Sequence, residues 1–357
     1  MFSVIRTGIV AVITVALIGP PLAARAADLT YVTSFGATYG NGNGQFKAPF
    51  GVAVDSVGNV YVADDSSNQV DRFNPSNFSG TFISFGTGGN GNGQFAGPDG
   101  VTVDSSGNVY VADTGNYRIV RFNPSNFSGT FTSFGCTFGG GNGQFASPRN
   151  VAIDSSGLVY VTDLPNGRIV RFDPSNFSGT FTSFGTPGVG NGRFAAPYGV
   201  AVDSSGLVYV VDRGANQIVR FDPSNFSGTF TSFGTGGSGN GQFTSPNGLA
   251  VDSSGNVYVA DTYNGSRLVQ FNPSNFSGTF TSFGTQGNGN GQFYVPFGVA
   301  VDSSSNVYVA DTGNYRIVQL KNGITSSIQV PEPSDVLGIL ALGVIGLVAK
   351  FKRLPCS

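Results

Sequence analysis

Pairs of aspartate and arginine recur along the chain at nearly fixed spacing, and such pairs are candidates for acid–base chemistry. Asp113 is followed five residues later by Arg118. The pairing recurs three more times, as Asp163 with Arg168, Asp261 with Arg267, and Asp311 with Arg316. Gln takes the place of Arg in two further copies, Asp64 with Gln69 and Asp212 with Gln217. A pair repeated in this way is typical of a structural contact between two strands, so we predict no catalytic residue among these side chains.

Other segments have some features of metal-binding or phosphate-binding loops. The turn Asp203-Ser204-Ser205-Gly206 offers one carboxylate, whereas a Ca²⁺ loop places several oxygen ligands in one short segment. The loop from Gly88 to Phe95 lacks both the Asp of Ca²⁺-binding nonapeptide repeats and the Lys-Ser/Thr of a phosphate loop. The chain has no His, and its two cysteines are Cys136 and Cys356. The sequence therefore predicts neither a metal site nor a cofactor.

These side chains belong to a unit that is repeated six times. Each copy contains a short apolar run, an Asp-Ser-type turn and a second run that ends in Asp. The first aspartate of each copy follows the previous one by 49 or 50 residues. These aspartates are Asp55, Asp104, Asp154, Asp203, Asp252 and Asp302. A period of this length is typical of propellers, solenoids and arrays.

The pattern within one repeat predicts strands and no helix. In the second copy we expect strands at residues 101–103, 109–111, 118–122 and 129–134, separated by turns rich in Gly, Asn and Asp. Four antiparallel strands per unit predict an all-β fold, a six-bladed β-propeller. Its repeats would start near residues 46, 95, 145, 194, 243 and 293.

The first and last segments of the repeat region indicate how the ring closes. The last copy lacks the Thr-Ser-Phe-Gly motif of the fourth strand, and a copy of that motif ends the segment 29–36. We therefore expect an N-terminal strand to complete the last blade. Residues 324–330 are the alternative source of this strand.

The repeats resemble the NHL repeat over residues 29–320. The matching residues include Gly143-Gln144-Phe145, Val151-Ala152-Ile153-Asp154, Val159-Tyr160-Val161 and Arg168-Ile169. The resemblance implies a six-bladed propeller. Some NHL-like propellers are lyases or hydrolases that use metal-bound His at the channel. Because this chain has no His, we predict that it is not an enzyme; the alternative is an extracellular lyase or hydrolase with a site at the central channel that uses no His.

The charge balance bears on a second property of this family, since some NHL domains bind RNA. Residues 27–330 contain 13 Lys or Arg and 18 Asp or Glu, a net charge of −5. A nucleic-acid-binding domain usually presents a basic surface. The sequence therefore predicts no nucleic acid partner.

Two sets of residues differ between otherwise similar repeats. The first set follows a proline just before the first strand and comprises Phe50, Asp99, Arg149, Tyr198, Asn247 and Phe297. The second lies between the second and third strands and includes Tyr117, Arg213, Tyr263 and Tyr315. Both connections leave a four-stranded meander on the same face, so we expect both sets at one mouth of the central channel. We predict that they bind an extracellular polysaccharide or a surface protein; sequence drift in tolerant loops is the alternative.

The N-terminus has the pattern of a secretory signal peptide over residues 1–26. Arg6 precedes an apolar run from Gly8 to Gly19, and the small residues before position 27 predict cleavage by signal peptidase after Ala26. Residues 27–320 then form the propeller.

The C-terminus resembles the PEP-CTERM sorting signal of Gram-negative bacteria. Pro331, Glu332 and Pro333 lie in a linker at residues 321–335, and residues 336–357 contain an apolar segment followed by a basic end. The resemblance implies processing by an exosortase-type enzyme, a transient membrane helix and delivery to the cell surface or extracellular matrix. A permanent single-span anchor is the alternative.

Overall fold

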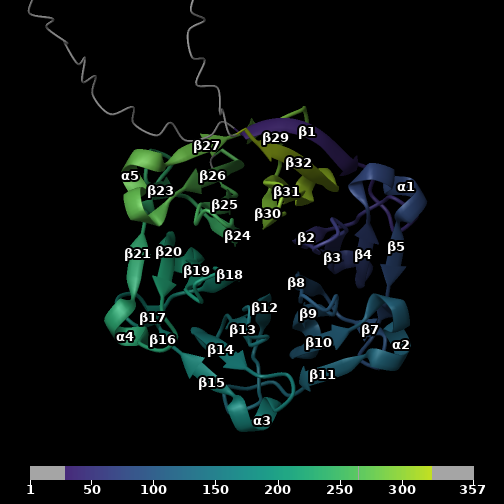
Figure 1. Cartoon of the computed structure of the whole chain (residues 1–357), viewed down its shortest axis with the longest axis horizontal. Coiled ribbons are helices and arrows are strands. Elements are labelled where there is room, and N and C mark those ends of the chain that lie inside the picture. The colour runs from purple at the N-terminus through teal and green to yellow at the C-terminus, as the bar shows by residue number, and fades with distance from the viewer. Residues whose placement is uncertain (1–28, 264, 324–357) are drawn as a thin grey trace, which may run out of the picture.

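Each repeat folds into one four-stranded sheet, because its β-branched runs are separated by tight turns that reverse the chain. The computed structural model describes residues 29–263 and 265–323. In this region six antiparallel sheets form a closed ring around a central axis (Figure 1). The structure confirms the predicted all-β, six-bladed β-propeller.

The strands of each blade follow one another from the axis outward. Blade 1 contains β2 (Pro49–Val54), β3 (Val60–Asp64), β4 (Gln69–Phe73) and β5 (Ile83–Phe85). Blade 2 contains β8 (Pro98–Val103), β9 (Val109–Asp113), β10 (Arg118–Phe122) and β11 (Thr132–Gly135). Blade 3 contains β12 (Pro148–Ile153), β13 (Val159–Asp163), β14 (Arg168–Phe172) and β15 (Thr182–Phe184).

The second half of the ring repeats this arrangement. Blade 4 contains β18 (Pro197–Val202), β19 (Val208–Asp212), β20 (Gln217–Phe221) and β21 (Thr231–Phe233). Blade 5 contains β24 (Pro246–Val251), β25 (Val257–Asp261), β26 (Arg267–Phe271) and β27 (Thr281–Phe283). Blade 6 contains β30 (Pro296–Val301), β31 (Asn306–Asp311), β32 (Arg316–Asn322) and β1 (Leu29–Gly36).

The N-terminal strand closes the ring, as the missing motif predicted. β1 pairs antiparallel with β32 and is the outermost strand of blade 6 (Figure 1). Phe35 of β1 is buried between blade 6 and blade 1, and Leu29 is buried between blades 5 and 6. The alternative strand at residues 324–330 lies outside the described residues.

The predicted fourth strand at 129–134 was wrong in its boundaries. Residues 127–130 form one helical turn, and β11 begins only at Thr132. The turn forms because the side chain of Asn126 accepts a hydrogen bond from Gly129 N and the hydroxyl of Thr130 donates to Asn126 O. In the described part of the chain, blades 1 to 5 each have such a turn: α1 (Phe78–Thr81), α2 (Phe127–Thr130), α3 (Phe177–Thr180), α4 (Phe226–Thr229) and α5 (Phe276–Thr279).

The Gly-Asn loops between blades form short parallel pairs of strands. The pairs are β6 (Thr87–Gly88) with β7 (Gln94–Phe95), β16 (Thr186–Pro187) with β17 (Arg193–Phe194), β22 (Thr235–Gly236) with β23 (Gln242–Phe243), and β28 (Thr285–Gln286) with β29 (Gln292–Phe293). The Phe that ends each pair is fully buried. These loops therefore attach the start of each blade to the core.

The core consists of six apolar clusters, one at each contact between blades. The cluster between blades 1 and 2 contains Ala63 and Val70 from one blade and Val111 and Phe122 from the next. Phe122 packs edge-on against Phe127, with ring centroids 4.8 Å apart. Burial of each such side chain contributes roughly 1.5–3 kcal/mol, so contacts between blades stabilise the ring.

Candidate binding site at the channel mouth

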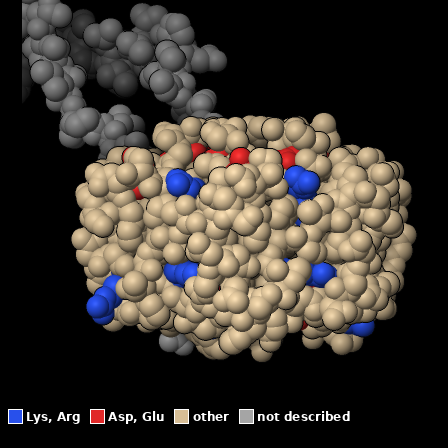
Figure 2. All heavy atoms as spheres, turned by 90° about the horizontal axis from the view of Figure 1, so that it is seen from below, with Lys and Arg blue, Asp and Glu red and all other residues tan. Residues whose placement is uncertain are grey.

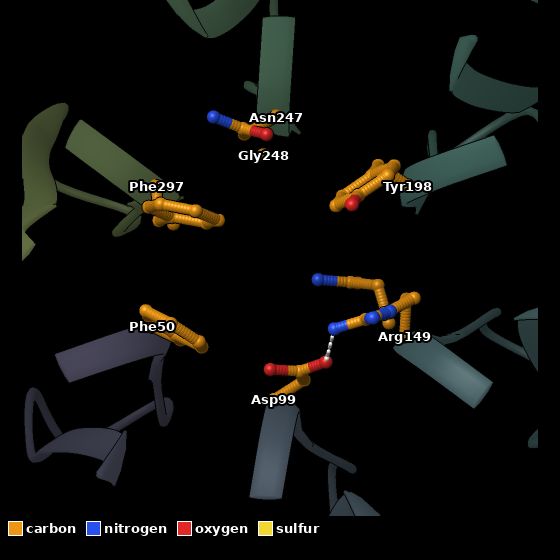
Figure 3. Close-up of a pocket in the computed structure, with 11 residues that line it drawn as sticks. Phe50, Asp99, Arg149, Tyr198, Asn247, Gly248 and Phe297 are labelled. Carbon is orange, nitrogen blue, oxygen red and sulfur yellow. Dashed lines mark hydrogen bonds and ion pairs between the residues drawn. The ribbon is translucent and has the colours of Figure 1, made fainter. Parts of the chain in front are cut away.

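A bulge in the innermost strand places the first variable set at the axis. In blade 2 the pairing of β8 with β9 shifts between Pro98 and Val101, so Asp99 and Gly100 are not paired with β9. A register shift follows the proline in all six blades, and in blade 1 it leaves only Phe50 unpaired, since Gly51 pairs with Ala63. A bulge redirects a side chain out of the sheet. The six residues that follow the prolines converge around the channel mouth: Phe50, Asp99, Arg149, Tyr198, Asn247 and Phe297 (Figure 3).

Close contacts between adjacent backbones form a neck beneath this ring. A Cβ atom on Gly100 would lie 2.6 Å from the Cα of Asn150, and one on Gly248 would lie 2.4 Å from the carbonyl oxygen of Phe297. Distances this short exclude a side chain, so glycine is required there. Asn150 takes the place of glycine in blade 3 and lines both the mouth pocket and the wider channel beyond it. Asn150 is thus a lining residue that our predicted set did not include.

Three aromatic side chains line the mouth pocket. Phe50 and Phe297 stack with ring centroids 4.5 Å apart and an interplanar angle of 19°. Tyr198 lies beside Arg149 (Figure 3), whose guanidinium is 5.6 Å from the centre of the tyrosine ring. The guanidinium of Arg213 lies 4.7 Å from the same ring. Two cations held near one ring restrict its motion through cation–π attraction.

An ion pair lies between Phe50 and Tyr198 in the ring of mouth residues (Figure 3). Arg149 Nη1 donates to Asp99 Oδ2 at 2.6 Å, and the hydroxyl of Thr114 lies 3.1 Å from the same oxygen. Asp99 is 8% exposed. Burial raises the pKa of Asp99 to about 6, although the positive charge of Arg149 opposes the shift. The carboxyl group therefore changes its charge close to neutral pH.

Two polar atoms at the mouth are buried and lack a hydrogen-bond partner among the described residues. The amide of Asn247 donates to the hydroxyl of Thr262, which in turn donates to Pro296 O. This arrangement identifies Asn247 Oδ1 as the free acceptor, and Asn247 is only 2% exposed. The free donor is Arg149 Nε. An unsatisfied buried polar atom is costly, and each of these two atoms has less than 1 Å² of exposed surface.

The second variable set is only partly at the mouth. Arg213 contacts Tyr198, and its Nε donates to Ser245 Oγ at 2.8 Å. Tyr117, Tyr263 and Tyr315 are not among the residues that line the pocket, and their predicted role in binding stays a prediction. The first residue of this loop in blade 2, Thr114, lies beside Asp99 at the mouth.

The three outer tyrosines have separate surroundings. The ring of Tyr117 packs edge-on against Phe138 at 5.2 Å, and that of Tyr315 packs against Tyr39 at 5.2 Å. Tyr263 is 60% exposed. These side chains form local contacts on the loops, away from the six residues at the axis.

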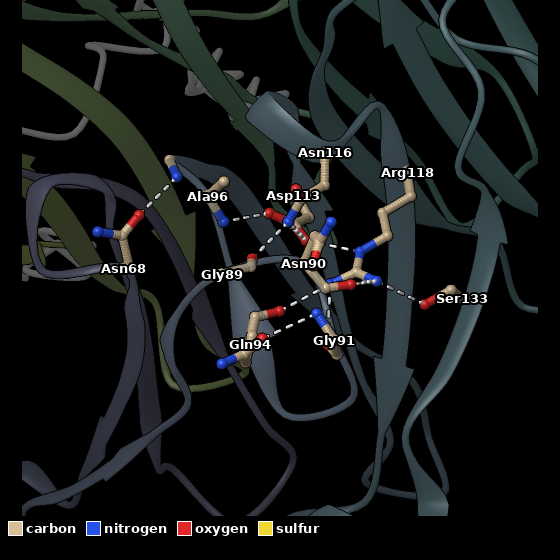
Figure 4. Close-up of polar contacts among 11 residues, drawn as sticks. Asn68, Gly89, Asn90, Gly91, Gln94, Ala96, Asp113, Asn116, Arg118 and Ser133 are labelled. Carbon is tan, nitrogen blue, oxygen red and sulfur yellow. Dashed lines mark hydrogen bonds and ion pairs between the residues drawn. The ribbon is translucent and has the colours of Figure 1, made fainter.

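The repeated Asp–Arg pairs are structural, as their recurrence indicated. Asp113 is fully buried and accepts hydrogen bonds from Ala96 N, Asn116 Nδ2 and Arg118 Nε (Figure 4). Arg118 also donates to backbone carbonyls of the preceding Gly-Asn loop, including Gln94 O at 2.7 Å. Each pair therefore attaches a loop to its blade and leaves no carboxylate free for chemistry.

Several predicted features lie outside the described residues. These are the cleavage site after Ala26 and the motif Pro331, Glu332 and Pro333. Over residues 29–263 and 265–323 the structure contains no helix with the length and apolar character needed to span a bilayer. In the same region no three His, Cys, Asp or Glu side chains come together as metal ligands.

Comparison with known proteins supports the fold and the repeat type. Five segments match the NHL repeat: residues 95–122, 145–172, 194–221, 243–271 and 293–320. The described region is therefore a six-bladed β-propeller in which five segments match the NHL repeat. No curated protein sequence matches the chain significantly.

Similar solved structures include a nutrient-binding protein and two enzymes. An auxiliary nutrient binding protein from Bacteroides ovatus has a TM-score of 0.58 and 16% identity, over 82% of this chain and 76% of the other. A gluconolactonase from Xanthomonas campestris has a TM-score of 0.56 and 15% identity, over 87% and 99%. Virginiamycin B lyase from Staphylococcus aureus has a TM-score of 0.51 and 16% identity, over 76% and 79%.

These similarities correct our prediction that the chain is not an enzyme. The absence of His excludes one type of metal chemistry, but lyases and gluconolactonases share this propeller architecture. Identities of 15–16% establish only that the folds are similar. A fold of this kind can serve either binding or catalysis. Whether this chain is an enzyme is thus unresolved, and its function has to be argued from the site.

Proposed function

We propose that the protein is an exported binding module that holds an extracellular polysaccharide or a surface protein at the mouth of its central channel. The supporting observation is the ring of six residues after the prolines. Equivalent bulges place five different residue types at one axis, next to a free acceptor on Asn247 and a free donor on Arg149. Ligand sites combine apolar walls with a few converging polar groups, and this pocket has both.

Export and surface sorting form part of the proposal. The signal-like residues 1–26 would be removed by signal peptidase, and the tail that contains Pro331, Glu332 and Pro333 would be processed by an exosortase-type enzyme. The ligand is then extracellular. On the side of the disc drawn in Figure 2, basic side chains lie apart from one another, without the continuous basic surface that nucleic acid binding uses.

A binding assay with matched variants tests the site. The full chain would be applied to an array of bacterial polysaccharides and purified surface proteins. We expect the combined variant Arg149→Ala, Tyr198→Ala and Phe297→Ala to lose the binding that the unmodified chain shows. The control carries Ser105→Ala, Ser155→Ala and Ser204→Ala in exposed turns at the other face and should bind normally. Equal binding by both variants would refute the proposal.

Mass spectrometry of the exported protein tests the localisation. We expect the mature chain to begin at Ala27 and to lack the C-terminal apolar segment, with the protein recovered from the cell surface or matrix. A full-length chain recovered from the cytoplasm would contradict this part of the proposal.

A second candidate function is enzymatic, and one observation favours it. Burial raises the pKa of Asp99 to about 6 within a pocket, and a general acid or base works best with a pKa near the ambient pH. Under this alternative Asp99 exchanges a proton with the bound ligand. Asp99→Asn should then abolish turnover while binding persists. Unchanged ligand after prolonged incubation with the unmodified chain would eliminate this candidate.

A further inference from the structure

Four of the six blades carry an arginine on the third strand, beside the tyrosine of the second strand. In blade 1 these residues are Arg72 and Tyr61, which are partners in the pairing of β3 with β4. Burial raises the pKa of Tyr61 to about 12, and the positive charge of Arg72 opposes this shift. The guanidinium of Arg72 also lies 5.8 Å from the centre of the Phe85 ring. The equivalent contact recurs at 5.3–5.9 Å in the next three blades, with Arg121, Arg171 and Arg220.

Blades 5 and 6 have glutamine in place of this arginine, and they differ in what surrounds it. In blade 5, Gln270 is buried and its Nε2 donates to the hydroxyl of Tyr258, which also accepts from Asn322 Nδ2. In blade 6, Gln319 lines an open cleft of about 380 Å³ between blades 6 and 1, at the face opposite the mouth. The chain itself therefore fills the position of the arginine in blade 5, whereas in blade 6 that position opens to solvent.

A second hydrogen-bond donor found in an equivalent site is also replaced in blade 6. Asn306 corresponds to Asn59 of blade 1, whose Oδ1 accepts a hydrogen bond from Asn74 Nδ2 at 3.3 Å. Lys321 occupies the position of that donor in blade 6 and donates to a backbone carbonyl at 2.6 Å instead. Lys321 is not among the residues that line the cleft. The amide oxygen of Asn306 is thus left to an outside donor.

The cleft carries a negative charge as well as these acceptors. Among the described residues that line it, Asp302 is the one with a charged side chain. Burial and the charge of Asp302 raise the pKa of Tyr308 in the floor of the cleft, and no Lys or Arg of the described residues opposes that shift. Asp302, Asn306 and Gln319 are each partly exposed, so a ligand can reach them. A positively charged group with several N–H donors complements this arrangement.

We propose that the cleft between blades 6 and 1 binds an arginine side chain of a partner protein, with its guanidinium on the Asp302 carboxylate and on the amide oxygens of Asn306 and Gln319. A guanidinium offers five N–H donors in one plane and keeps its charge in a protein. A lysine ammonium offers three donors and is more strongly hydrated, so it fits less well. The cleft is separate from the channel mouth, and this inference does not depend on the function proposed there.

An NMR titration of the full chain with short peptides tests the proposal. The probe is Gly-Ser-Arg-Ser-Gly, and its counterparts carry lysine or citrulline, the uncharged analogue of arginine, at the centre. We expect the arginine peptide to bind most tightly and the citrulline peptide at least about tenfold more weakly. Asp302→Asn should weaken binding of the arginine peptide about tenfold, while Asn still supports the turn. Asp252→Asn, the equivalent change in blade 5, should leave binding unchanged.

A second variant supplies the arginine from within the chain. Gln319→Arg should abolish binding of the arginine peptide and raise the melting temperature, because it restores the contact that blades 1 to 4 have. Gln286→Arg adds the same charge at an exposed site and should leave binding intact. Equal binding of the arginine and citrulline peptides, no binding at millimolar peptide, or binding insensitive to Gln319→Arg would each overturn the proposal.

Discussion

The two faces of the propeller differ in how strictly the six blades repeat. At the face opposite the mouth, every blade uses the same turn, in which an Asp carboxylate accepts backbone hydrogen bonds from residues two and four positions later, as Asp104 does from Ser106 and Asn108. The other five turns have the same pair of bonds. At the mouth, equivalent bulges present five residue types.

This difference separates what the fold requires from what it leaves free. The turn needs its Asp, because the carboxylate satisfies two backbone donors. The mouth needs only a bulge and close backbone contact, so the side chain after the proline does not determine the fold. The variable face is thus where a binding site can differ without loss of structure.

The substitution with the largest predicted effect removes a buried carboxylate that recurs in the repeats. Asp113→Ala leaves Arg118, which is 5% exposed, without its carboxylate. We expect the free energy of unfolding to fall by about 3–5 kcal/mol, because an uncompensated buried charge is costly. Chemical denaturation measures this loss. Asp99→Asn at the mouth is the matched control and should change stability far less, since the side chain of Arg149 is 31% exposed.

Replacing a buried Asp in blade 1 should change stability in the opposite direction. Asp71 occupies the position of Val120 and its equivalents, is 2% exposed and accepts a hydrogen bond from Ser84. Asp71→Val should stabilise the protein by about 1–3 kcal/mol at pH 8, since a buried polar group is replaced by an apolar one. Thermal melting of both proteins at that pH measures the gain.

The pH dependence of this effect follows from the pKa of Asp71. Burial raises that pKa from 3.8 to about 8. The folded state keeps a proton that the unfolded chain releases, so this group lowers stability as the pH rises from about 4 to about 8. The gain from Asp71→Val should therefore be larger at pH 8 than at pH 4. A gain independent of pH would show that Asp71 is ionised throughout.

A substitution in one of the repeated Asp turns should lower stability moderately. Asp104→Ala removes the carboxylate that accepts hydrogen bonds from two backbone amides. We expect a loss of about 1 kcal/mol, because the exposed turn can recruit water in place of the carboxylate. Replacing Asp154 in the next blade should give the same result in urea denaturation. Unequal losses would mean that the blades are less equivalent than their shared hydrogen bonds indicate.

The smallest effect on stability is expected at the mouth. Asn247→Ala removes one hydrogen bond to Thr262 and also one unpartnered buried acceptor. These changes oppose one another, so we expect a net change within about 0.5 kcal/mol. Calorimetry measures it. A loss of several kcal/mol would show that Asn247 serves the fold and would weaken the comparison between the faces.

The sequence predicted the architecture well because the period and the missing last strand are both visible in it. It also indicated the six residues at the axis, since they vary where their neighbours do not. The helical turn at 127–130 was not predicted, because it depends on side-chain capping by Asn126 and Thr130. The free atoms of Asn247 and Arg149 could not be predicted either. Their environment depends on contacts between adjacent blades, which sequence spacing does not reveal.

Hydrogen–deuterium exchange of the full chain, with and without a ligand identified on the array, is the most direct test of the account. We predict protection of the segments around the six prolines at the mouth, such as residues 98–100, 148–150 and 246–248, with no change in the Asp turns at the other face. Protection confined to those turns, or to the outer wall of the disc, would contradict a binding site at the channel mouth.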